Sequence, residues 1–293
     1  MFILSGLSEA VNFLTVFKLR RLDSRQRGND KKGKNKNSGE DAVKDGALYA
    51  EYVMRLKKSI KYFPAAGLFI GLLLAAVFYI FNRFLPVQPS ILLSIFFLYI
   101  ITGGLHFDGL SDTADGFFAY LKSGDKNRFY KAMKDVNTGN AGNTALIFYV
   151  LIMWSLITQA EPAQSFTPGF ILNFNFMYLI LLTFPVAGRY SITVMSYFSA
   201  TPENFKGIGT IFTEGTDTAS LIAASVLTLI IIYFFLKLAG IFSLLVTVLA
   251  VLSVSFYFGK KFGGVNGDML GFTVKFSEVV FTAALIGFHG TLY

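Results

Sequence analysis

The sequence predicts an all-α, polytopic membrane protein: a bundle of about six to eight transmembrane helices, in a single integral-membrane domain (residues 1–293) with an active site on its cytoplasmic face. Hydrophobic residues make up 54% of the 293 positions and charged residues only 15%. Apolar runs of roughly 20 residues recur as far as the C-terminus. The chain has no Cys, which excludes disulfides and Cys-ligated metals. Together these features exclude disordered, collagen-like and coiled-coil proteins.

The N-terminal part combines an apolar segment with a strongly basic one. Met1–Phe17 is expected to be a retained interfacial or partly inserted helix and not a signal peptide, because no basic region precedes it and no small-residue cleavage site follows it. Lys18–Lys61 carries 14 basic and 6 acidic residues, which gives a net charge of +8. Such an excess predicts a cytoplasmic segment. Within it, residues 23–47 are rich in Lys, Asn and Gly and are predicted to form a flexible cytoplasmic insertion.

The remaining apolar runs predict the membrane spans. Alternation from the basic segment places residues 120–143, 200–220 and 260–275 in the cytoplasm, together with every polar, glycine-containing stretch. The predicted spans are Phe63–Phe81, Pro89–Gly104, Thr144–Ile157, Leu172–Phe198, Leu221–Leu236, Gly240–Phe258 and Val279–Leu292.

The most informative motif is Gly103–Gly116, GGLHFDGLSDTADG, directly after the second span. On a helix, Asp108, Asp112 and Asp115 fall within an arc of about 60°. Carboxylates this close repel one another, so the motif predicts a bound cation, and Mg²⁺ or Mn²⁺ suits oxygen ligands better than Zn²⁺ does. His106 is expected either to donate a hydrogen bond to a phosphate or to have a structural role. The alternative is a set of exposed carboxylates on an amphipathic cytoplasmic helix.

A second motif, Arg128–Gly142, places basic residues before a glycine-containing loop that leads into the third span. Arg128 and Lys134 suit phosphate oxygens, as do the free backbone N–H groups at the start of a helix. Asp135 is a further candidate metal ligand. The alternative is an ordinary basic flank of a membrane helix.

The third motif, Gly263–Glu278, places Asp268, Lys275 and Glu278 on one helical face after Asn266. The alternative is a purely structural role, in which Asp268 caps the helix and Lys275 and Glu278 form a local ion pair. Arg189 is the only charge predicted inside the fourth span. Charges within a membrane usually face a partner, so Arg189 is expected to meet a substrate phosphate or one of the aspartates.

In this order the motifs resemble the cobalamin synthases, the adenosylcobinamide-GDP ribazoletransferases. The resemblance rests on GGLHFDGLSDTADG, on MKDVNTGNAG at Met133–Gly142 and on GGVNGDMLG at Gly263–Gly271 with Glu278, supported by FPAAGLFIG at Phe63–Gly71 and by Gly188–Arg189. It implies a multi-pass enzyme of the cytoplasmic (inner) membrane that uses Mg²⁺. Its substrates would be adenosylcobinamide-GDP and α-ribazole or the 5′-phosphate of α-ribazole, and it would release GMP.

The resemblance also implies roles for individual residues. The metal would be held by Asp108, Asp112, Asp115 and Asp135, and Asp115 would accept the hydroxyl proton. Besides the two substrates, the expected partner is the lipid bilayer and not a nucleic acid, with a homo-oligomer or an association with other late cobamide-pathway enzymes as further expectations. The predicted substrate-binding residues are His106, Arg128, Lys134, Arg189, Asn266, Asp268, Lys275 and Glu278.

Other membrane-protein classes fit the motifs less well. CDP-alcohol phosphotransferases continue their signature from Asp-Gly into Ala-Arg, whereas Leu110 follows Asp108-Gly109 here. Membrane prenyltransferases have a second Asp-rich segment, which this chain lacks. A cation-coupled transporter would use the carboxylates to bind its driving ion, but no carboxylate is predicted in the middle of a span.

Overall fold

The computed structural model describes residues 2–15, 40–160, 175–203 and 207–292, and within these ranges all regular secondary structure is helical. Helix α1 (Phe2–Leu14) packs against α3 (Glu40–Ser59) and α4 (Phe63–Phe81), with the short 3₁₀ helix η1 (Ile60–Tyr62) between α3 and α4. The predicted insertion lies mostly outside the described residues. Its last residues, from Glu40 on, begin α3 and are helical, not a flexible loop.

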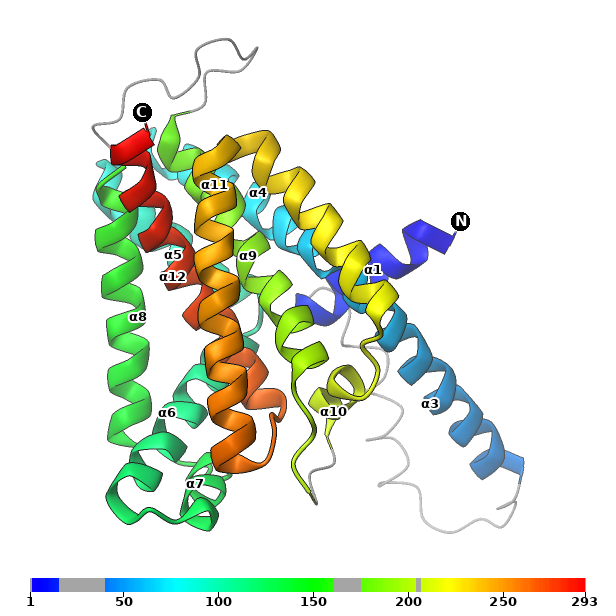
Figure 1. The fold of residues 1–293 in the computed structure, drawn as a ribbon. Coiled ribbons are helices and arrows are strands. Elements are labelled where there is room, and N and C mark those ends of the chain that lie inside the picture. Colours follow the sequence, from blue (N-terminus) through cyan, green and yellow to red (C-terminus); the bar gives the residue numbers. More distant parts are fainter. Residues whose placement is uncertain (1, 16–39, 161–174, 204–206, 293) are drawn as a thin grey trace.

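The body of the molecule is a bundle of apolar helices (Figure 1). Within the described ranges, five helices are long and apolar enough to cross a membrane, or up to six if a bent pair forms one span, which confirms the multi-pass architecture. The helices after α4 that make up the bundle are α5 (Val87–Ile101), α8 (Asn140–Thr158), α9 (Phe176–Phe198), α11 (Thr218–Phe262) and α12 (Gly267–Leu292).

Two bends in the chain decide how the helices are arranged. Helix α11 breaks at Lys237, which has φ 50° and ψ −138°, so its two arms correspond to the predicted spans Leu221–Leu236 and Gly240–Phe258. The second bend, of 91°, lies between α5 and α6 (Leu105–Ser123). Helix α6 and the following α7 (Lys126–Met133) therefore lie at one end of the bundle (Figure 1), and we treat both as outside the spanning segments.

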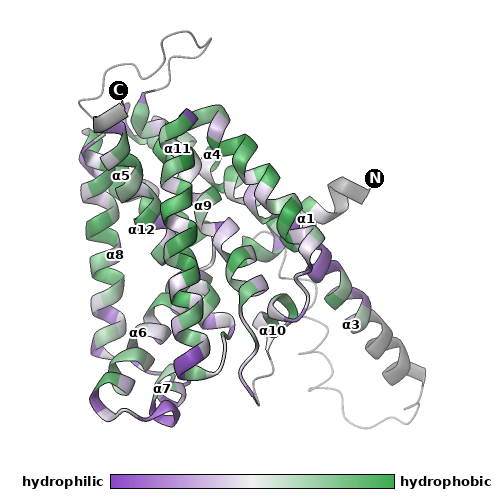
Figure 2. Ribbon diagram, viewed as in Figure 1, coloured by the Kyte–Doolittle hydropathy of each residue, from purple (hydrophilic) through white to green (hydrophobic). Residues whose placement is uncertain are grey.

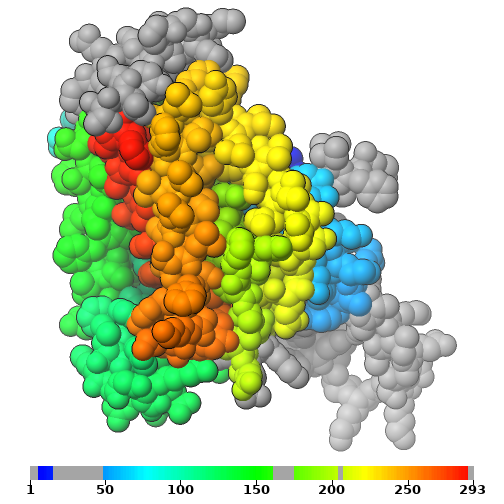
Figure 3. Space-filling model, viewed as in Figure 1, coloured from blue at the N-terminus to red at the C-terminus, as the bar shows by residue number. Residues whose placement is uncertain are grey.

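The central helix is α9, which is buried on every side from Leu179 to Ser196. It packs against α4, α11 and α12. Helix α4 approaches it closely because Gly67 lies against its backbone: a Cβ atom there would be 2.5 Å from the carbonyl oxygen of Pro185. In the space-filling view the two arms of α11 cover much of one face, and the end of α9 reaches the surface low between them (Figure 3). The glycines of the FPAAGLFIG motif thus serve helix packing.

The outer surface separates into apolar and polar parts (Figure 2). Large apolar side chains such as Phe96, Phe148, Ile230 and Phe256 are exposed on the sides of the bundle, where lipid would cover them. Hydrophilic residues gather around α7 at the end of the bundle (Figure 2). This end also contains the short helix α10 (Ile208–Thr213) and the start of α12.

Two sequence predictions about the last span are wrong. We expected it to start at Val279, but the helix that is long and apolar enough to cross a membrane starts at Gly267, so Lys275 lies within the candidate span and not before it. We also expected no carboxylate within a span, whereas Glu278 lies in α12 and is completely buried. Both errors have one cause: the charges of α12 find partners inside the bundle, so this part of the helix does not need an apolar sequence.

Candidate active site

Helix α6 presents the predicted carboxylates. It begins after Gly103 and Gly104, whose φ angles of 59° and 76° suit glycine and turn the chain away from α5. Asp108 is exposed, while Asp112 and Asp115 are partly buried. The three carboxylates therefore share one helix, as the sequence predicts.

A fourth carboxylate reaches this group from α12, because the two helices cross at a pair of glycines. A Cβ atom on Gly109 would lie 2.8 Å from the Cα atom of Gly271, so the backbones are almost in contact. Burial, followed by the charges of Asp268, Asp108 and Asp115, raises the pKa of Asp112 to about 6. Asp268 is thus an electrostatic neighbour of the α6 carboxylates. Their mutual repulsion is the situation that a bound cation would relieve.

Asp115 has a clear structural task. Its Oδ2 accepts a hydrogen bond from the backbone N–H of Gly139 at 2.7 Å, and its Oδ1 accepts one from that of Gly142 at 2.9 Å. The carboxylate therefore caps the start of α8, where the helix dipole favours a negative charge. The N–H groups that the sequence assigns to phosphate bind this carboxylate instead. Both oxygens of Asp115 are engaged, which weakens its assignment as the proton acceptor.

The structure does not bring Asp135 into the carboxylate group. Its Oδ1 accepts hydrogen bonds from the backbone N–H and the side-chain amide of Asn137, at 3.0 and 3.2 Å, in an exposed turn. Asp135 is also absent from the charges that act on Asp112. Among the described residues, no three His, Cys, Asp or Glu side chains already stand in metal-binding geometry. A cation bound there would therefore require the carboxylates to move closer together.

The predicted phosphate-binding residues Arg128 and Lys134 are exposed, on α7 and at its C-terminal end. Helix α7 packs against α6 at Gly116, where a Cβ atom would be 2.6 Å from the Cγ atom of Met133. Both basic residues thus lie at the same end of the bundle as the carboxylates. Their assignment to phosphate stays a prediction.

Arg189, Lys275 and Glu278 form a separate cluster, completely buried between α9 and α12. Arg189 is paired with Glu278, and the Nζ atom of Lys275 lies 3.0 Å from Oε2 of Glu278. The hydroxyl of Tyr149 donates to the same Oε2 at 2.5 Å. Lys275 also lies 3.9 Å from the ring centroid of Phe107. The cluster ties α8, α9 and α12 together with one net positive charge.

This cluster corrects three sequence predictions. Arg189 was expected to meet a substrate phosphate or an aspartate, but its partner is Glu278. Lys275 and Glu278 were expected to bind substrate, but their side chains are sealed inside the bundle. Gly188 is the sequence feature that could have indicated this pairing, because its lack of a side chain makes room for Glu278. A Cβ atom at Gly188 would be 2.8 Å from Cγ of Glu278.

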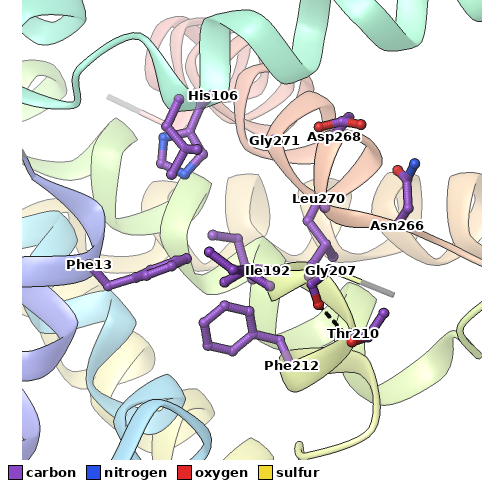
Figure 4. A pocket seen from close by; sticks show the side chains of 14 residues that line it. Phe13, His106, Ile192, Gly207, Thr210, Phe212, Asn266, Asp268, Leu270 and Gly271 are labelled. Carbon is purple, nitrogen blue, oxygen red and sulfur yellow. Dashed lines mark hydrogen bonds between the residues drawn. The ribbon is translucent and has the colours of Figure 1, made fainter. Parts of the chain in front are cut away.

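The other predicted polar residues gather around a pocket of about 350 Å³ (Figure 4). His106, Asn266 and Asp268 line it, and the Oδ1 of Asn266 accepts the backbone N–H of Met269 at 3.0 Å. Most of the lining is apolar, and sequence reasoning missed this part because apolar residues carry no signal in a chain so rich in them. The apolar side chains are Phe13, Leu105, Ile192, Ile208, Phe212 and Leu270.

Comparisons with known proteins agree on one family. The family model described as cobalamin-5-phosphate synthase matches residues 43–286. A protein of Clostridioides difficile (strain 630) is 32% identical over 76% of this chain and 85% of its own length. A protein of Fusobacterium nucleatum is 30% identical over 78% of this chain and 87% of its own length. Both are named adenosylcobinamide-GDP ribazoletransferase. No solved structure gives a significant match.

Proposed function

This chain belongs to the cobalamin-5-phosphate synthase family, and from that premise we propose that it joins adenosylcobinamide-GDP to α-ribazole or to its 5′-phosphate. The transferase class follows from the relatives, which are named adenosylcobinamide-GDP ribazoletransferase. The observation that carries the proposal is the meeting of Asp268 with Asp108 and Asp112 at the crossing of α6 and α12.

The reaction transfers a phosphoryl group from a diphosphate linkage to an alcohol. A ribose hydroxyl of the ribazole attacks the phosphorus that is bonded to cobinamide, and a new phosphorus–oxygen bond forms. The bond from this phosphorus to the oxygen of GMP breaks, GMP leaves, and the hydroxyl proton is released. Such a reaction needs positioning and charge neutralisation more than a covalent nucleophile.

The carboxylates suit Mg²⁺ in the kind of donor that they offer. Asp108, Asp112 and Asp268 supply oxygen atoms only, and burial, together with the neighbouring negative charges, raises the pKa of Asp112 to about 6. We assign the metal to these three residues and leave Asp135 out, because Asp135 is held in its own turn. When bound, Mg²⁺ would offset the charge of the diphosphate.

The surrounding residues fix this arrangement. Asp115 holds the start of α8 against α6 through the N–H groups of Gly139 and Gly142, so the two helices keep one relative position. Arg128 and Lys134, exposed at the same end of the bundle, are assigned to phosphate oxygens of the substrates. The buried Arg189 keeps a structural task through its partner Glu278.

We place the protein in the cytoplasmic membrane with this site on the cytosolic side. The basic segment Lys18–Lys61, with its net charge of +8, supports that orientation. This segment includes α3, whose first residues lie toward the same end of the molecule as α6 and α7 (Figure 1). Substrates made in the cytosol would reach the site without crossing the bilayer.

Product analysis tests the proposal. Purified protein in detergent is given adenosylcobinamide-GDP and α-ribazole 5′-phosphate, first with Mg²⁺ and then with a chelator. We expect GMP and a new cobamide in equal amounts with Mg²⁺ and neither with the chelator. If the chelator leaves cobamide formation unchanged, the assignment of a metal is wrong. If folded protein yields no GMP, the proposed reaction is wrong.

A further inference from the structure

The pocket beside the carboxylates is lined mostly by apolar side chains, and this lining suits some chemical groups of the two substrates better than others. It lies between α1, α6, α9, α10 and α12, and Asp268 of the carboxylate group forms part of its wall. Figure 4 shows Asp268 and Asn266 toward one end of the pocket, and His106 and the ring of Phe13 toward the other. A ligand in the pocket would therefore have one end near the proposed metal and the other against an aromatic wall.

The aromatic wall is built from rings that pack on one another. Phe13 and Phe212 meet edge to face with ring centroids 5.0 Å apart, and Phe212 meets Phe63 in the same way at 5.3 Å. Ile192, on the central helix, adds to this apolar surface. A flat aromatic group packs well against such a wall.

Few polar groups in the pocket remain available to a ligand. The hydroxyl of Thr210 donates to the carbonyl oxygen of Gly207 at 2.7 Å, and Oδ1 of Asn266 already accepts a hydrogen bond. His106 is different: it is only 2% exposed, and its Nδ1 has no hydrogen-bond partner in the part of the chain that the structure describes. Buried polar atoms are rarely left unpaired. The imidazole at the aromatic end thus has hydrogen-bonding capacity that the protein does not use.

Three parts of the two substrates compete for this space. A corrinoid is far larger than a pocket of 350 Å³. Guanine carries a carbonyl, an amine and a ring N–H, which would lose their partners against apolar walls. The base of ribazole is flat, bicyclic and apolar except for one unsubstituted ring nitrogen, which needs a single donor.

We propose that this pocket binds the aromatic base of the ribazole substrate, with the unsubstituted ring nitrogen accepting a hydrogen bond from His106 and the ribose directed toward Asp268. This inference rests on the proposed function and goes beyond it by assigning a specificity-determining residue. The aromatic wall formed by Phe13 and Phe212 holds the faces and edges of the base. His106 donates a hydrogen bond to the one polar ring atom that distinguishes the base from a hydrocarbon.

Equilibrium dialysis tests the hydrogen bond with two ligands, α-ribazole and its indole analogue, in which carbon replaces the accepting ring nitrogen. We expect the unmodified protein to bind α-ribazole about tenfold more tightly than the analogue. The His106→Phe variant should bind both ligands equally, because it keeps a ring but no donor. If the substitution causes only a structural defect, the affinities for both ligands should fall and their ratio should stay at about tenfold. That result would overturn the role of His106.

A second variant tests the pocket itself. Ile208 lines the pocket but is 54% exposed, so Ile208→Trp narrows the space without disturbing the core. This variant should lower the affinity for α-ribazole by about tenfold or more and leave the affinity for adenosylcobinamide-GDP unchanged. Ile222→Trp, at a residue of α11 that is 58% exposed, is the matched control and should change neither affinity. Unchanged α-ribazole binding by Ile208→Trp would overturn the proposal.

Turnover by the unmodified protein separates this inference from the proposed function. If the protein makes cobamide and GMP but the variants bind α-ribazole normally, only the pocket assignment fails. If it neither binds α-ribazole nor releases GMP, the proposed function fails with it.

Discussion

The crossing of α6 and α12 provides the sharpest prediction, because it depends on two residues without side chains. In Gly109→Ala, the new Cβ atom would start 2.8 Å from the Cα atom of Gly271 and 2.5 Å from the carbonyl oxygen of Asp268. Two carbon atoms pack favourably at about 3.5 Å, so the helices must separate by about 0.7 Å. Because both helices belong to a close-packed bundle, this shift moves Asp268 away from Asp108 and Asp112.

The expected result is a fall in kcat for GMP release of roughly 10- to 100-fold, since a displacement of about 1 Å at a reacting centre can cost a factor of about 100. Gly287→Ala is the matched control, because it makes the same substitution in α12, the other helix of the crossing, at a position where a Cβ atom would meet none of the described atoms within 4 Å. The assay is steady-state GMP release at saturating Mg²⁺, with size-exclusion profiles to show that both variants are folded. Equal activity of Gly109→Ala and Gly287→Ala would refute the role of the crossing.

The remaining predictions concern charged and polar side chains that stabilise the fold. Asp115→Asn loses a charged cap of α8 and should lower the free energy of unfolding by about 1–2 kcal/mol, seen as a lower Tm in detergent; an unchanged Tm would contradict the cap. Glu278→Gln leaves Arg189 and Lys275 buried without a counter-charge and should cost about 3–5 kcal/mol. Tyr149→Phe removes one hydrogen bond to the same carboxylate and should cost only about 1 kcal/mol. Thermal unfolding of the last two variants side by side measures the difference, and equal losses would contradict the account of the buried cluster.

Local patterns in the sequence predicted the fold well. The span Phe63–Phe81 coincides with α4, and the gap between the predicted spans Leu221–Leu236 and Gly240–Phe258 contains the break at Lys237. Apolar runs predict these helices because a membrane span needs about 20 apolar residues. The prediction failed at α12 for a different reason. Lys275 and Glu278 interrupt the apolar pattern, and the pattern does not show that Arg189 of α9 pairs with Glu278 inside the bundle.

The candidate site was predictable only where its residues share a helix. Asp108, Asp112 and Asp115 follow one another at spacings of four and three positions, so helical periodicity places them on one face. Choosing Asp268 and not Asp135 as their neighbour depends on which helices cross, and that is decided by the contact of Gly109 with Gly271 far along the chain. Periodicity within one helix contains no information about such a contact.

The central claim is that Asp268 completes a cation site with Asp108 and Asp112 and that Asp135 does not belong to it. The most direct measurement is the Mg²⁺ dependence of GMP release by Asp268→Asn and Asp135→Asn. The account predicts that Asp268→Asn needs about tenfold or more Mg²⁺ for half-maximal activity, the scale on which altering a metal site acts, while Asp135→Asn behaves like the unmodified protein. An unchanged Mg²⁺ requirement in Asp268→Asn, together with a raised one in Asp135→Asn, would contradict it.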